Sequence, residues 1–177
     1  MNQLQNIQLN RPDLEAYKRQ AKMRIILLLD NIRSGLNVGA IFRTADAFAV
    51  EAIYTCGITV HPPHPEIMKT ALGATESVNW THFDTTIEAI QQIKAKQYSL
   101  IAIEQTDRSI SLEQFNPDQR FAAALVFGNE MRGISPEVLQ ACDMAIEIPQ
   151  QGIKHSLNVA TSAGIVLWEC YKRIYRR

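Results

Sequence analysis

The sequence has few cysteines and no long apolar run. Its three cysteines, Cys56, Cys142 and Cys170, are odd in number and widely spaced, which indicates reduced core thiols in a cytosolic protein. Apolar runs such as Ile25 to Leu29 are far too short to cross a membrane. The N-terminus has no apolar stretch typical of a signal peptide. We therefore expect a cytoplasmic protein with no membrane partner.

The sequence also lacks net charge, because 18 basic residues balance 18 acidic ones. This balance argues against a nucleic-acid partner, since phosphate binding needs a positive field. The charges are segregated, however. Residues 11–24 carry five basic and two acidic groups, residues 169–177 four and one, and residues 104–147 three and eight. Capture of RNA depends on the local field, so neutrality does not exclude it.

Several catalytic and binding motifs are absent. There is no GxGxxG, no GxxxxGK[ST] and no GxSxG, which disfavours a dinucleotide-binding Rossmann site, a P-loop NTPase and a hydrolase elbow. His61 and His64 flank two prolines, and nothing nearby supplies further zinc ligands at fixed spacing. We expect no metal site.

What the sequence does contain is an alternation of apolar strands with amphipathic helices. Met23 to Asp30 is a continuous apolar run, typical of a strand buried on both faces of a parallel sheet. The fold class is therefore α/β, with a mostly parallel sheet and helices on both faces. The predicted strands are 23–30, 51–56, 78–83, 98–103, 121–127 and 144–148. The predicted helices are 13–20, one from Asn37 to Ala49, 85–97, 135–142 and 156–174, and 61–75 is a proline-rich loop with one helical turn.

Polar residues gather where three strands end and helices begin, which is the usual ligand site of open α/β sheets. The three junctions are Asp30–Ala47, Val126–Ser135 and Ile146–Gly164. In the first, Arg43 lies off the apolar stripe of its helix with small neighbours, so it is open to a partner. The alternative is a surface ion pair with Asp46 at i+3.

Other polar residues of these junctions have simple structural explanations. Asn37 and Ser156 both suit helix N-caps, and Glu130 suits a solvated loop carboxylate. Asn158 is harder to explain in this way, because an amide in the first turn of an apolar helix needs partners.

The last helix is apolar on two sides, which indicates burial against its own sheet and against a second subunit. We therefore predict a homodimer. The two stripes are Leu157, Ala160, Gly164, Trp168, Tyr171 and Val159, Ala163, Val166, Cys170.

At the three junctions the sequence resembles the SpoU (TrmH-type) family of RNA ribose 2′-O-methyltransferases, within the SPOUT class. The likeness covers residues 22–175 and includes the connector Lys69 to Val78. The residues that carry it are Asn31, Asn37, Gly39 and Arg43, then Gly128, Asn129, Glu130 and Gly133, then Ile148, Pro149, Ser156, Leu157 and Asn158.

The resemblance implies a methyltransferase domain over residues 22–177 with a C-terminal trefoil knot, an exception to the usual unknotted topology. Residues 1–21 would form a short helical extension. The resemblance further implies S-adenosylmethionine as cofactor, a dimer, and tRNA or rRNA as substrate. The implied cofactor loops lie at Ile103, Gly128, Ile148 and Leu157, and the implied catalytic set is Arg43 with Asn37, Glu130, Ser156 and Asn158 around it.

The implied reaction moves a methyl group from a sulfonium to a ribose 2′-oxygen, and a neutral hydroxyl is a poor nucleophile. Arg43 stays protonated in proteins, so we favour a grip on the adjacent phosphate and the emerging oxyanion; a phosphate-assisted base is the alternative. Arg33, Lys69 and Lys154 are predicted to contact phosphates.

Many family members carry a separate RNA-binding domain, whereas about twenty residues precede the first strand here. We therefore expect the catalytic domain itself to capture RNA. Two rival interpretations are an inactive RNA-binding module of the same fold and a small-molecule enzyme of the α/β class. Binding of S-adenosylmethionine discriminates the active enzyme from a pure RNA binder.

Overall fold

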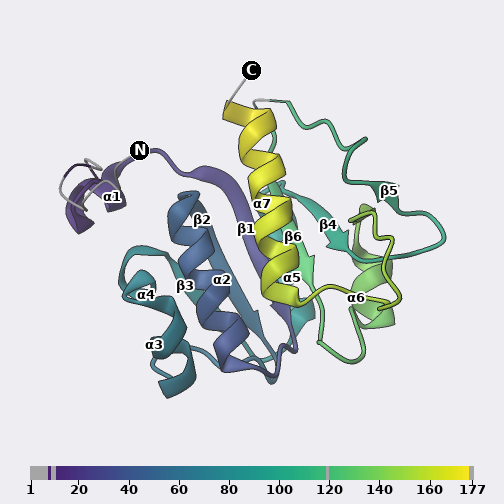
Figure 1. The fold of residues 1–177 in the computed structure, drawn as a ribbon, viewed down its shortest axis with the longest axis horizontal. Helices are drawn as coiled ribbons and strands as arrows, with labels where there is room; N and C mark the ends of the chain where they lie inside the picture. The colour runs from purple at the N-terminus through teal and green to yellow at the C-terminus, as the bar shows by residue number, and fades with distance from the viewer. Residues whose placement is uncertain (1–7, 9–10, 119, 176–177) are drawn as a thin grey trace.

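The centre of the molecule is a parallel sheet of seven strands, seen in a computed structural model that describes residues 8, 11–118 and 120–175 (Figure 1). The strand order is β3-β2-β1-β6-β4-β7-β5, and every pairing is parallel. The strands are β1 (Met23–Asp30), β2 (Val50–Cys56), β3 (Trp80–Phe83), β4 (Ser99–Ile103), β5 (Ile110–Ser111), β6 (Ala123–Phe127) and β7 (Met144–Glu147).

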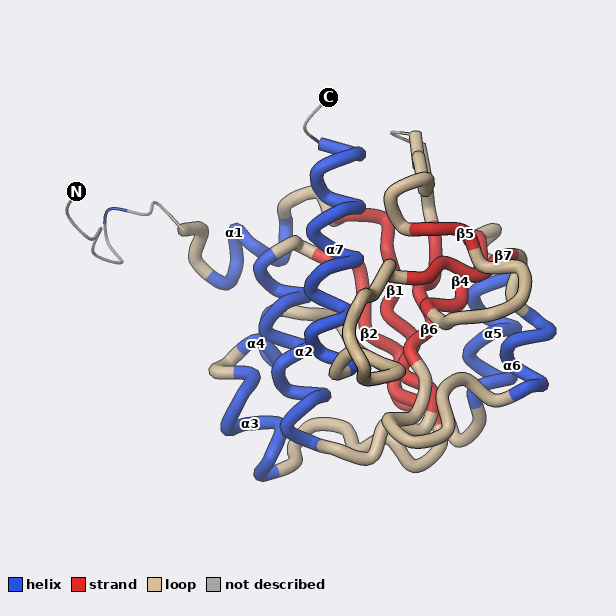
Figure 2. Tube along the Cα trace, turned by 45° about the vertical axis from the view of Figure 1, so that its right-hand side comes forward, coloured by secondary structure: helices blue, strands red, loops and turns tan. Residues whose placement is uncertain are grey.

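Helices cover both faces of this sheet, as Figures 1 and 2 show. One apolar cluster lies between the sheet and α2 and α7, and a second lies between the opposite face and α5 and α6. The helices are α1 (Leu14–Arg19), α2 (Gly35–Ala47), α3 (Pro65–Ala71), α4 (Ala74–Ser77), α5 (Thr86–Ala95), α6 (Pro136–Ala141) and α7 (Val159–Tyr175).

Strand β1 explains why the sheet is buried on both faces. Leu27 and Leu29 belong to the cluster under α2 and α7, while Ile26 and Leu28 belong to the opposite cluster. Side chains alternate between faces along a strand, so an uninterrupted apolar run fills both cores. The predicted α/β class, the parallel sheet and the two helical layers are confirmed.

Two helices, α2 and α7, begin two or three residues from the predicted start. Helix α2 begins at Gly35 because the Ser34 hydroxyl accepts a hydrogen bond from the Asn37 N–H (3.3 Å) and caps the helix. Helix α7 begins at Val159 because Asn158 Oδ1 accepts from the N–H groups of Ala160 (2.9 Å) and Thr161 (3.2 Å). The predicted caps, Asn37 and Ser156, are therefore wrong.

The proline-rich loop holds more structure than predicted. It contains both α3, with Pro65 in its first turn, and α4, where one helical turn was expected. Strand β5 was missed, since two residues are too few to show a pattern. Strand β3 starts at Trp80, two residues after the predicted start.

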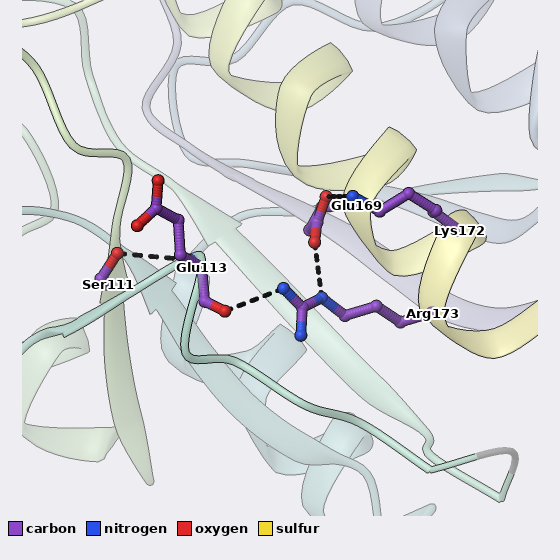
Figure 3. A network of polar contacts seen from close by, with 5 residues as sticks. All are labelled: Ser111, Glu113, Glu169, Lys172 and Arg173. Carbon is purple, nitrogen blue, oxygen red and sulfur yellow. Dashed lines mark hydrogen bonds and ion pairs between the residues drawn. The ribbon is translucent and has the colours of Figure 1, made fainter. Parts of the chain in front are cut away.

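The C-terminal half of α7 is tied to the segment that follows β5 (Figure 3). Glu169 forms ion pairs with Lys172 and Arg173, each at 2.6 Å, and Arg173 Nη2 donates to the carbonyl oxygen of Glu113 (2.9 Å). Hydrogen bonds from Lys172 and Arg173 hold the pKa of Glu169 below its ordinary value. These contacts hold the segment after β5 against the last helix.

At the other end of the chain, α1 lies beside α4 and α2, where the Tyr17 hydroxyl donates to the carbonyl oxygen of Asp46 (3.0 Å). Residues 1–7 and 9–10 of the predicted extension lie outside the described residues. No helix within the described ranges is long and apolar enough to span a membrane.

Candidate active site

A cavity of about 510 Å³ opens at the carboxyl ends of β4, β6 and β7. All four predicted cofactor residues line it, as do three of the five predicted catalytic ones. They are Ile103, Gly128, Ile148 and Leu157, with Glu130, Ser156 and Asn158. Because parallel strands end at one edge of the sheet, junctions far apart in sequence meet here. The structure gathers these residues; their roles remain predictions.

The loop after β6 forms one wall of the cavity and folds back on itself. Asn129 and Gly133 exchange backbone hydrogen bonds of 3.0 and 2.8 Å. A Cβ atom on Gly128 would lie 2.2 Å from the carbonyl carbon of Gly133, and Gly133 itself has a φ of +67°. Glycine is therefore required at both positions, and the loop presents its backbone to the cavity.

Glu130, at the tip of this loop, is held by the beginning of α2. Its carboxylate accepts hydrogen bonds from the N–H groups of Arg33 (3.0 Å) and Ser34 (3.1 Å) and from Asn37 Nδ2 (3.1 Å). Burial disfavours the ionised form, but the hydrogen bonds outweigh it and hold the pKa of Glu130 below its ordinary value. Glu130 is therefore an ionised tether rather than the solvated carboxylate of the structural alternative.

Asn37 and Asn158 extend this contact to the last helix. Asn158 Nδ2 donates to Asn37 Oδ1 (3.0 Å), while Asn158 Oδ1 caps α7. The carboxylate of Glu130 can only accept and the α7 N–H groups can only donate, so both amides are fixed in orientation. One hydrogen-bonded chain thus joins all three junctions, and it supplies the partners that Asn158 was expected to need.

Arg43 lies elsewhere in the single chain. It lines a second cavity, of about 800 Å³, together with Tyr17, Asp46, Ala74 and Tyr171. Arg43 is six residues beyond Asn37, or about 9 Å further along α2. The alternative ion pair with Asp46 is not formed among the described residues, and the Asp46 carboxylate accepts instead from the Ser77 hydroxyl.

The three predicted phosphate contacts are all exposed, with Arg33 before α2, Lys69 on α3 and Lys154 in the loop before α7. Glu104 and Arg132 also line the first cavity, although neither was predicted. Glu104 directly follows a buried strand, so the strand-end rule applied to a fourth junction would have found it.

The cysteines are free thiols, and burial raises the pKa of Cys56, Cys142 and Cys170 to about 12. Such thiols are poor nucleophiles at neutral pH. Across the described ranges, no group of three or more His, Cys, Asp or Glu side chains is placed to hold a metal ion.

The tether predicts a pH-dependent stability. Because folding lowers the pKa of Glu130 from 4.5, its contribution is complete at neutral pH and is lost as pH falls through the folded-state pKa. The difference in unfolding free energy between wild type and Glu130→Gln is expected to be constant from about pH 8 to 6 and to shrink between about pH 5 and 3. Urea denaturation at each pH measures it.

Glu137→Gln, at an exposed glutamate of α6, is the control, with an expected effect within about 0.5 kcal/mol at every pH. A wild-type advantage over Glu130→Gln that grows on acidification would contradict the tether.

Comparisons with known proteins agree with this geometry. The model of the SpoU rRNA Methylase family matches residues 24–168. The tRNA (guanosine(18)-2′-O)-methyltransferase of Aquifex aeolicus is 30% identical over 162 residues, which are 88% of this chain and 72% of that protein. The 23S rRNA (guanosine-2′-O-)-methyltransferase RlmB of Neisseria meningitidis is 33% identical over 145 residues, which are 82% of this chain and 57% of that protein.

A solved structure is similar as well. The AdoMet-bound rRNA methyltransferase of Sinorhizobium meliloti superposes with a TM-score of 0.78 at 25% identity, over 92% of this chain and 60% of that one. The chain thus spans little more than half the length of some relatives and only 10% of the mouse tRNA methyltransferase TARBP1. The family match covers most of the chain and all three junctions, so the protein belongs to the SpoU rRNA methylase family.

Proposed function

We propose that the protein transfers a methyl group from S-adenosylmethionine to a ribose 2′-hydroxyl of tRNA or rRNA. The observation that carries this proposal is the cavity at Ile103, Gly128, Ile148 and Leu157, bordered by the hydrogen-bonded chain from Glu130 to Asn158. Relatives named for guanosine 2′-O-methylation of tRNA and rRNA support the reaction, and an AdoMet-bound neighbour supports the cofactor.

The cavity residues fit this cofactor. Because Gly128 has no Cβ, the loop backbone can pass close to it without a clash. The volume of the cavity lies in the range of ordinary ligand sites. Glu104, Glu130 and Glu147 line the cavity against a single Arg132, so its field favours a sulfonium and an ammonium. When bound there, S-adenosylmethionine supplies an activated methyl group. A built cofactor cavity favours an enzyme over an inactive RNA-binding module.

The side chains divide into two roles in this proposal. Glu130, Asn37 and Asn158 satisfy one another and hold the loops in register, so none of them is a free base. Ser156 makes no hydrogen bond among the described residues and lies at the cavity, where its hydroxyl suits the ribose. Arg43 supplies fixed positive charge for the RNA phosphate and for the oxyanion that forms as the hydroxyl proton leaves. A phosphate-assisted Arg43 base is the alternative.

A homodimer would bring Arg43 to this cavity. The stripe of Leu157, Ala160, Gly164, Trp168 and Tyr171 runs from Leu157, just before α7 at the first cavity, to Tyr171, at the cavity of Arg43. Trp168 on that stripe is 43% exposed, and a Cβ on Gly164 would meet nothing within 4 Å. Two α7 helices packed antiparallel about a twofold axis would place each Arg43 near the partner's first cavity.

The trefoil knot, the domain boundary at residue 22 and a cytoplasmic location belong to the same proposal. The segment before α7 lies against the loop after β4, where Gln105 Nε2 donates to the carbonyl oxygen of His155 (3.0 Å). The far end of α7 is tied to Glu113 by Arg173. Both contacts support a chain that threads between these segments.

Arg43→Ala is expected to lower methyl transfer at least about 100-fold, because it removes the positive charge beside the oxyanion. The affinity for S-adenosylmethionine is expected to stay within twofold, because in this proposal Arg43 binds the RNA phosphate and the oxyanion and not the cofactor. Incorporation of tritiated methyl into RNA and isothermal titration measure the two quantities. Arg120→Ala, at an exposed arginine that lines neither cavity, is the control. Near-normal turnover of Arg43→Ala would contradict the proposed catalytic role of Arg43.

Arg33→Gln, Lys69→Gln and Lys154→Gln are each expected to weaken RNA binding and to reduce the slope of log affinity against log salt by about one. Filter binding at several salt concentrations measures the slope. Lys94→Gln on α5, exposed on the opposite face, is the matched control. Slopes that match the wild type in all three variants would exclude these phosphate contacts.

Trp168→Glu is expected to convert a dimer into a monomer of 20.0 kDa, because it buries a charge in the apolar interface. Sedimentation velocity measures the mass. Met68→Glu on α3 is the control, since Met68 is also 43% exposed but lies off the stripe. A wild type that sediments as a monomer at micromolar concentration would contradict the dimer.

A further inference from the structure

Two carboxylates flank the point where β6 enters the cofactor loop. Strand β6 lies between β1 and β4, with Leu29 opposite Phe127 and Ala102 opposite Val126. Continuing both registers places Asp30 and Glu104 on either side of Gly128. Neither residue belongs to the catalytic or cofactor sets inferred from the sequence.

The two carboxylates bind consecutive amides of the returning chain. Glu104 Oε2 accepts from the Ile134 N–H (3.3 Å), and Asp30 Oδ2 accepts from the Ser135 N–H (3.2 Å). The Ile134 nitrogen lies directly over Gly128, where it would be 2.3 Å from an added Cβ. The loop is thus held closed at its neck, by which we mean the place where its first residue, Gly128, meets its last residue, Ile134.

Both carboxylates are themselves fixed. Asp30 is 1% exposed, and its Oδ1 accepts from the Thr86 hydroxyl (2.6 Å) and from Asn31 Nδ2 (2.8 Å). Glu104 Oε1 accepts from the Gln105 N–H (3.0 Å). A buried carboxylate with several donors keeps its position, because each lost bond would leave a polar group unpaired.

We propose that Asp30 and Glu104 form a clamp that positions the loop 128–134 and thereby sets the affinity for S-adenosylmethionine. This inference rests on the proposed function of the cavity. The loop backbone forms a wall of the cavity. If the two ends of the loop separate, binding of the cofactor must bring them together again. The apparent affinity then falls in proportion to the fraction of molecules whose loop is closed. The clamp acts through the loop, so Asp30, which does not line the cavity, is a positioning residue, whereas Glu104 positions the loop and also contributes its charge to the cavity.

The experiment compares Glu104→Ala and Glu104→Gln with Asp143→Ala in the full chain. Asp143 is a matched control because its Oδ2 also accepts from a backbone N–H, that of Leu100 (2.7 Å), but at the amino ends of β4 and β7. Isothermal titration with S-adenosylmethionine, steady-state methylation and hydrogen exchange of residues 128–135 without cofactor are measured, together with the melting temperature.

Glu104→Ala is expected to raise the Kd and the KM for S-adenosylmethionine about tenfold or more and to leave kcat within about twofold. Its loop amides exchange faster than those of the wild type. Glu104→Gln keeps one acceptor oxygen, so its Kd and its rate of loop exchange are expected to lie between those of the wild type and Glu104→Ala. Asp143→Ala lowers the melting temperature but leaves the Kd within twofold.

Asp30→Asn tests the other arm and is expected to weaken binding in the same direction. The clamp is overturned if folded Glu104→Ala and Glu104→Gln both bind the cofactor within twofold of the wild type, or if loop exchange is unchanged. A wild type that binds no S-adenosylmethionine would refute the proposed function alone, because loop exchange would still decide the clamp.

Discussion

The structure of the site depends on one carboxylate. Glu130 reaches from the loop after β6 to the beginning of α2, where it accepts hydrogen bonds from Arg33, Ser34 and Asn37. Asn37 passes the contact to Asn158, which caps α7. This tether joins Asn37 to Glu130, 93 residues away in the sequence, and to Asn158, 121 residues away. Glu130 and Asn158 both line the first cavity, so the tether fixes two of its walls relative to each other.

The fold makes such a tether possible. A parallel sheet buried on both faces brings the carboxyl ends of its strands to one edge, and the loops there are free to differ in length and composition. The strands beside β6 add a second constraint on the same loop. Asp30 and Glu104 bind the neck of the loop, and Glu130 fixes its tip. Tip and neck are fixed by different elements, which limits how the loop can move.

Much of this was predictable from the sequence. Strand β1 has the predicted bounds, because its apolar segment has the length of a buried strand, and the four predicted cofactor residues line one cavity. Asn37 was misjudged because Ser34 and Asn37 are both good caps, and only the fold decides which hydroxyl or amide is used. The position of Arg43 away from the first cavity could not be predicted from the sequence, because motif spacing does not show which way a helix runs or where a partner subunit lies.

The proposed role of the cavity is methyl transfer to a ribose oxygen. Total RNA lacking this modification would be incubated with the protein and labelled S-adenosylmethionine, digested to nucleosides and analysed by mass spectrometry. We expect label in 2′-O-methylribose, and no 2′-O-methylribose is expected to form when the cofactor is omitted. Label on a nucleobase, or transfer to a small molecule but never to RNA, would contradict it.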